Sequence, residues 1–140
     1  MQTDFKGDSK PLIPQNRTFQ LNKQLILTCR KLETGPLENY THMATLIHKV
    51  NLLMLECDSI VQLRNIQRLV FSEKLLSTIV DFCMNTESFA NFGIRLCEIF
   101  ALEFPAEIAK SDIFAVIKGL LRTNDYETVA QCLSFLNVIA

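Results

Sequence analysis

The sequence predicts an all-α fold built from stacked pairs of helices, an architecture called an α-solenoid. Apolar residues recur at the three- and four-residue spacing of a buried helix face, and no alternating run is long enough to indicate a strand. The pattern of residues 75–101, two apolar segments joined by a polar turn, returns over residues 113–140. A helix pair that repeats at about 40 residues is typical of solenoids, which usually hold other macromolecules.

The composition fits one globular domain. The chain has 140 residues, 49% of them hydrophobic, which is enough to form an extensive core. Its formal charge is −1, so it lacks the clustered excess of Lys and Arg that a nucleic-acid surface requires. No uncharged apolar run reaches the ~20 residues that a membrane span needs, and we expect no membrane contact.

The cysteines indicate free thiols in a reducing compartment. There are five, an odd number, widely spaced within apolar helical patterns, and they form no CxxC pair and no cluster with His. We therefore expect buried thiols and no bound metal. The polar first 16 residues lack the apolar core of a signal peptide. These features favour a nuclear or cytoplasmic protein.

Two regions divide the chain. Residues 1–16 contain Gly7, Pro11 and Pro14 and few large apolar groups, and we interpret them as a flexible N-terminal tail. A helical repeat domain is expected over residues 17–140. Its first helix should begin near Thr18 and end at the stop signal of Gly35 and Pro36.

The second and third helices follow from their caps and apolar stripes. Asn39 is the predicted N-cap of a helix with the stripe Met43, Leu46, Ile47, Val50, Leu53, Met54 and Cys57. Asp58 and Ser59 are expected to cap a third helix that runs through Phe71, with Ile60, Leu63, Ile66 and Val70 facing inward. The polar side of that helix carries Gln62, Arg64, Asn65, Gln67 and Arg68.

The remaining helices form the two repeated pairs. Ser72 precedes a predicted helix over 73–84, and its partner runs from Ser88 to about Phe104, where Pro105 ends it. One short helical turn is expected over 106–110. Ser111 or Asp112 then caps the helix of the second pair, and Asp125 caps the last helix, which runs to residue 140.

The last predicted helix carries apolar residues to the end of the sequence, without a polar turn after them. They are Val129, Leu133, Leu136 and Ile139. The terminal units of a solenoid need a polar outer side for solubility. We therefore expect an exposed apolar C-terminal edge that is covered by further repeats or by a partner.

Residues 117–140, IKGLLRTNDYETVAQCLSFLNVIA, resemble an armadillo repeat. Residues 75–101 fit the same template less closely, and residues 43–71 fit it loosely. The resemblance to the armadillo/HEAT-like α-helical repeat superfamily implies a right-handed α-solenoid of such helix pairs. Irregular armadillo-like folds within large assemblies, including subunits of chromatin-remodelling complexes, are a looser comparison that the sequence fits more easily.

The resemblance also locates the positions that clamp a peptide in peptide-binding armadillo proteins, an Asn and a Trp one turn before it. Asn137 and Leu133 occupy these positions in the last repeat, and Glu98 and Ile94 occupy them in the preceding one. The chain contains no Trp. It therefore departs from the regular peptide-binding pattern.

No constellation of residues indicates catalysis or a cofactor. His42 and His48 are six positions apart, so on a helix they point to different sides and cannot share a metal. The carboxylates Asp81, Glu87, Glu98 and Glu103 have no orienting partner in the sequence pattern. We expect a protein that is not an enzyme and that carries no cofactor.

The leading hypothesis is a non-catalytic protein-binding scaffold or a subunit of a larger complex, which docks partners on its helical-repeat surface. The later helix of each pair would supply the polar contacts, from Asn91, Arg95, Glu98, Gln131, Ser134 and Asn137. The alternative is a small helical nucleic-acid-associated factor with a modest basic face. Its candidate residues are Arg64 and Arg68, with Arg30 and Lys31.

Overall fold

The computed structural model describes residues 13–35 and 39–139, and over these residues the chain forms helices and no strand. Most of the predicted tail therefore lies outside the described residues. The helices are α1 (Ile13–Thr34), α2 (Tyr40–Met54), α3 (Ile60–Val70), α4 (Glu73–Asn85), α5 (Ala90–Phe100), α6 (Pro105–Lys110), α7 (Ile113–Leu120) and α8 (Tyr126–Ile139).

Four of the predicted N-caps are confirmed by hydrogen bonds to backbone amides that the helix itself cannot satisfy. The side chains of Asn39, Ser59 and Ser72 each accept a bond from the N–H three residues later, at 3.0–3.1 Å. Asp125 accepts from the N–H of Glu127 and from the hydroxyl of Thr128. Each cap satisfies a donor that would otherwise be unpaired, typically worth about 1 kcal/mol.

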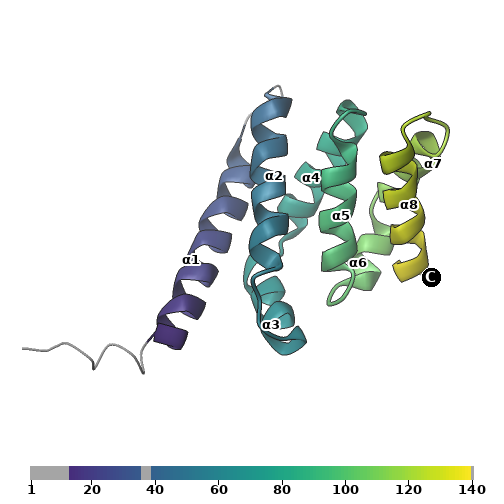
Figure 1. Ribbon diagram of the computed structural model, residues 1–140. Coiled ribbons are helices and arrows are strands. Elements are labelled where there is room, and N and C mark those ends of the chain that lie inside the picture. The colour runs from purple at the N-terminus through teal and green to yellow at the C-terminus, as the bar shows by residue number, and fades with distance from the viewer. Residues whose placement is uncertain (1–12, 36–38, 140) are drawn as a thin grey trace, which may run out of the picture.

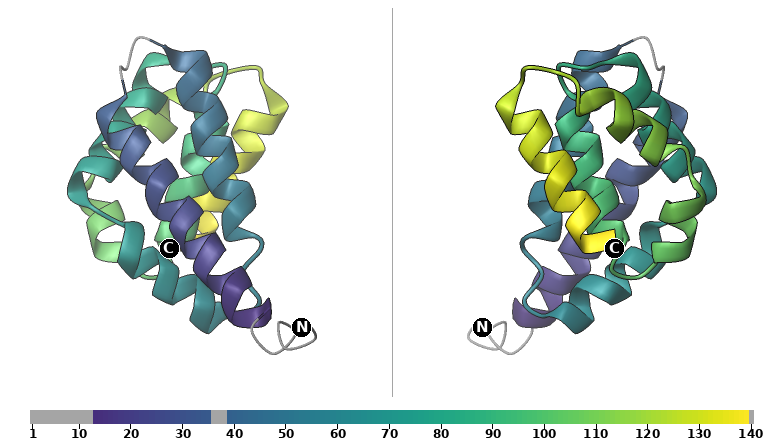
Figure 2. Two further views of the ribbon diagram at one scale, coloured as in Figure 1. Left: turned by 90° about the vertical axis from the view of Figure 1, so that its left-hand side faces the viewer. Right: turned by 90° about the vertical axis from the view of Figure 1, so that its right-hand side faces the viewer.

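Two layers of helices form the body of the molecule. In Figure 1, α2, α5 and α8 stand side by side, α1 lies obliquely next to α2, and α4 and α7 lie behind. Figure 2 looks along this row and separates α2, α5 and α8 from the layer that contains α4 and α7. The short helices α3 and α6 connect the layers at one end of the molecule.

The two repeated segments lie as neighbouring antiparallel pairs. Helix α4 packs against α5 and α7 packs against α8, while α5 and α8 share the most extensive contact between two helices in the described fold. The core between the layers includes the fully buried rings of Phe82, Phe100 and Phe135. Helices α4 and α5 approach closely at Gly93, where a Cβ atom would lie only 2.3 Å from the Cys83 sulfur.

Several predicted boundaries differ from the structure. Helix α1 begins at Ile13 and not near Thr18, because Pro14 falls in the first turn, where no intrahelical N–H bond is needed. Helix α2 ends at Met54, so Cys57 lies beyond the helix. Helix α5 begins at Ala90 and ends at Phe100. Pro105 begins α6 and does not simply end the preceding helix.

Helix α3 is rotated relative to the prediction. Ile66 and Val70 are buried as expected, but Ile60 is 54% exposed and therefore does not face inward. Gln67, placed on the polar side by its residue type, has 0% exposure. The buried stripe of α3 is thus shifted, because contacts with α1 determine which side of this short helix is covered.

The predicted apolar edge of α8 is present in part. Leu133 is 55% exposed, and Val138, which the pattern did not single out, is 46% exposed. Val129, Leu136 and Ile139 are only half-buried, and the last two pack against the core. Within the described part of the chain, no helix is long and apolar enough to cross a membrane.

Candidate protein-binding site

A hollow of about 160 Å³ opens on the face of the layer formed by α2, α5 and α8. Its apolar lining comes from Leu52 of α2 and from Leu55, the residue after that helix, whose side chains are 49% and 66% exposed. Its other lining residues are His48, Asn51, Asn91, Phe92, Arg95 and Gln131. We call this feature the α2–α5 hollow.

Asn51 is the unusual residue of the hollow, because it is a polar side chain with only 3% exposure. Its Nδ2 atom donates to the backbone carbonyl of Phe92 at 3.1 Å, which ties α2 to α5. Its Oδ1 atom is buried and has no hydrogen-bond partner. A buried acceptor left unsatisfied typically costs about 1–3 kcal/mol, so a donor that reached it would be favoured.

His48 and Phe92 cover one side of the hollow. Their ring centroids are 5.0 Å apart with an angle of 38° between the planes. The His48 side chain is exposed, so its ring can move without unpacking the core. Because the Asn51 Oδ1 atom is buried, a donor can reach it only if neighbouring side chains move.

Arg95 gives the hollow its positive charge. The residue is exposed, and among the described residues no carboxylate oxygen lies within 4 Å of its side-chain nitrogens. The neighbouring carboxylate of Glu98 is already engaged, because Gln131 donates to one oxygen at 2.8 Å and Ser134 to the other at 3.1 Å. These two bonds join α5 to α8 and leave the Arg95 guanidinium free for a partner.

The structure thus groups most of the predicted contact residues and separates the rest. Asn91, Arg95 and Gln131 line the hollow, and Glu98 and Ser134 lie next to it through Gln131. Asn137 is exposed on α8 but does not line the hollow.

The predicted basic face on α3 lies elsewhere and is largely paired. Arg68 binds Glu103 at 2.6 Å, and Arg64 lies 3.9 Å from the other oxygen of the same carboxylate. Arg30 contacts Glu33 at 3.0 Å and also donates to the backbone carbonyl of Val70. This pairing reduces the positive charge that these arginines would present to a phosphate backbone.

Four of the five cysteines are buried as expected, and Cys57, beyond the end of α2, is only half-buried. Burial raises the pKa of Cys29 and of Cys97 to about 12, and it raises the pKa of Cys83 well above its ordinary value. Because the thiolate is the reactive form, these side chains are poor nucleophiles at neutral pH. They serve as small apolar residues in the interior.

Sequence reasoning missed the contribution of α2 to the hollow. The sequence pattern excludes a shared metal at His48 and assigns no contact role to Asn51, Leu52 or Leu55. One signal was available, since Asn51 interrupts the apolar run from Val50 to Met54. A polar residue inside such a run is either hydrogen-bonded in the interior or directed at a ligand.

The hollow offers hydrogen bonds, the positive charge of Arg95, which no described carboxylate pairs, and exposed apolar side chains. No three His, Cys, Asp or Glu residues of the described segments gather closely enough to hold a metal ion. Comparison with protein-family models, with curated proteins and with solved structures finds no match for the chain. The fold and the hollow therefore define an all-helical protein with a candidate docking surface.

Proposed function

We propose that the protein is a non-catalytic binding scaffold, or a subunit of a larger complex, whose α2, α5 and α8 surface docks a protein partner. The observation that carries the proposal is the buried Asn51 Oδ1 atom, which lacks a partner within the α2–α5 hollow. A backbone N–H of a docked segment has the chemistry to satisfy it. Such a segment would also bring a carboxylate to Arg95 and apolar side chains to Leu52 and Leu55.

We further propose that the two layers form a right-handed α-solenoid of armadillo/HEAT-like helix pairs. The side-by-side order of α2, α5 and α8 supports this, as does the matching contact between α4 and α7 in the second layer. Within that scheme, the exposed Leu133 and Val138 form an edge for further repeats or a partner. A nuclear or cytoplasmic location fits the buried, protonated thiols.

Charge substitutions on this surface test the proposal. The Arg95→Glu/Leu133→Glu variant should lose a stoichiometric partner that the unaltered protein retains on capture from cells. It places a repulsive charge at the hollow and a second charge on the apolar edge of α8. Both side chains are exposed, so helical content measured by circular dichroism should not change.

The matched control is Lys23→Glu/Leu27→Glu on α1, where both side chains are also exposed. This variant should retain the partner. Equal retention by the two variants would refute the assignment of the surface, as would equal loss.

A further inference from the structure

A second groove lies in the other layer, between α4 and α7. Its larger hollow, of about 330 Å³, is lined by Cys83, Met84, Glu87, Ala115, Val116, Gly119 and Leu120. A smaller, separate hollow of about 180 Å³ lies between the same two helices, nearer their starts, with Glu73, Val80, Asp81 and Asp112 among its lining residues. We call the two together the α4–α7 groove.

The floor of the groove is apolar and its walls permit close approach. Val80, Val116 and Leu120 form the floor and are 4–7% exposed. Met84 is 49% exposed at one wall, and a Met side chain adapts readily to the shape of a partner. A Cβ atom added at Gly119 would meet nothing within 4 Å, so this wall is open.

Every charged residue that lines the groove is acidic. These residues are Glu73, Asp81, Glu87 and Asp112, and no Lys, Arg or His is among the lining residues. Among the described residues, none of the four carboxylates lies within 4 Å of a cationic nitrogen.

Local helix stability explains only some of these charges. Glu73 and Asp112 lie at helix N-termini, where a negative charge is favourable. Asp81 lies in the interior of α4, outside its first turn, so the helix dipole does not stabilise this carboxylate.

We propose that the α4–α7 groove binds a basic amphipathic helix of a protein partner. Helix α4 rises about 20 Å over its 13 residues, with Glu73 and Asp81 along it and Glu87 just beyond its end. A partner helix of similar length would place a large apolar side chain in the hollow beside Gly119. Its Lys and Arg side chains would pair with the carboxylates along the walls.

Two other ligand classes fit the groove less well. Phosphate groups of a nucleic acid would be repelled by four carboxylates. A metal ion requires several ligands around one point, and the described acidic side chains are too dispersed to form such a group. Dispersed negative charge beside an apolar floor matches a partner with several separate cations and an apolar stripe.

The test is selection from a library of random peptides of about 16 residues, a length that spans the groove as a helix. The full-length protein serves as bait. The selected peptides should carry Lys or Arg on one side and apolar residues at i, i+3 or i+4, and i+7 on the other. The proposal would be overturned if no peptide were enriched, or if the enriched peptides shared a consensus without basic residues.

Two variants then locate the binding of the selected peptides. Gly119→Leu fills the open space, and Asp81→Lys/Glu87→Lys reverses two charges along the groove. Each should weaken binding at least about tenfold, through lost space or like-charge repulsion. Circular dichroism confirms that each variant is folded.

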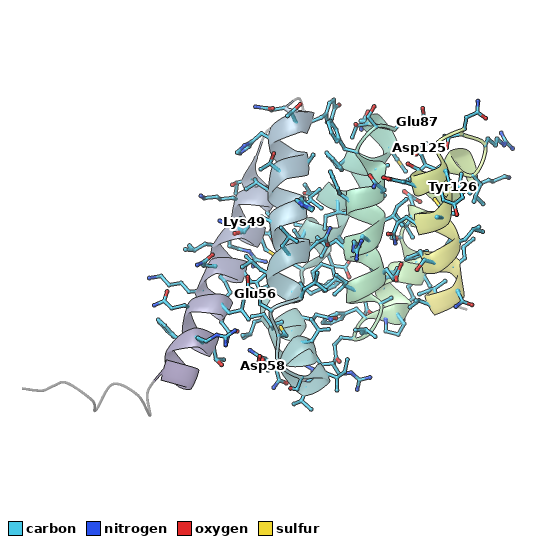
Figure 3. The ribbon with its side chains drawn as sticks, viewed as in Figure 1. Lys49, Glu56, Asp58, Glu87, Asp125 and Tyr126 are labelled. Atoms are coloured by element: carbon cyan, nitrogen blue, oxygen red, sulfur yellow. The ribbon has the colours of Figure 1, made fainter. Side chains whose placement is uncertain are left out.

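The matched control is Glu56→Lys/Asp58→Lys, which makes the same charge change at an exposed site. Figure 3 shows Glu56 and Asp58 near the end of α2, at the opposite end of the molecule from Glu87. The affinity of this control variant for the selected peptides should stay within about twofold of the affinity of the unaltered protein. Unchanged affinity in both groove variants, or an equal loss in the control, would refute the groove as the binding site.

Discussion

Gly93→Ala is expected to destabilise the protein by about 2 kcal/mol, although alanine has a higher helix propensity than glycine. The new Cβ atom would lie 2.3 Å from the Cys83 sulfur and 3.3 Å from the Ile79 Cγ2 atom. Both neighbours are buried, so either the Cys83 side chain must leave its rotamer or α4 and α5 must move apart. Urea unfolding followed by circular dichroism measures the change in the free energy of unfolding.

Two controls isolate the cause of this effect. Gly119→Ala meets open space and should instead stabilise the protein by about 0.5–1 kcal/mol, which is the helix preference alone. Adding Cys83→Ala to Gly93→Ala removes the sulfur and should recover much of the lost free energy of unfolding. The interaction energy between the two substitutions should exceed about 1 kcal/mol. Stabilisation by Gly93→Ala would contradict the close contact of α4 and α5.

Phe135→Ala should cost about 3–5 kcal/mol, a large share of the stability of a small domain. The ring has 0% exposure and packs edge-on against Phe114 of α7, with centroids 6.0 Å apart. Its removal would leave a cavity between α7 and α8. Thermal and urea unfolding report the loss.

Leu133→Ala is the matched control on the same helix. Leu133 is 55% exposed, so its truncation should cost less than about 1 kcal/mol. The two side chains are two residues apart and therefore lie on nearly opposite sides of the helix. A larger cost for Leu133→Ala than for Phe135→Ala would show that α8 is rotated from the orientation described.

The local elements were predictable because their causes lie within a few residues. The caps at Asn39, Ser59, Ser72 and Asp125 act on amides two or three positions away. The apolar stripe of α2 is buried from Met43 to Met54 because its periodicity matches a single covered side.

The features that were not predictable depend on contacts between distant segments. Gln67 is buried because its helix packs against α1, which its own residue type does not reveal. The α2–α5 hollow joins residues of three helices, and the bond from Asn51 to Phe92 spans 41 positions. The pairing of Arg64 and Arg68 with Glu103 likewise depends on the path of the chain between α5 and α6.

Photo-crosslinking in living cells tests most directly whether the surface of α2, α5 and α8 binds a partner. A photoreactive amino acid at position 95, and separately at position 131, would replace residues that line the α2–α5 hollow. Position 23 on α1 is the control. We predict that positions 95 and 131 crosslink to the same segment of one protein and that position 23 does not. Crosslinks to that protein from position 23 alone, or none specific to positions 95 and 131, would contradict the proposed function.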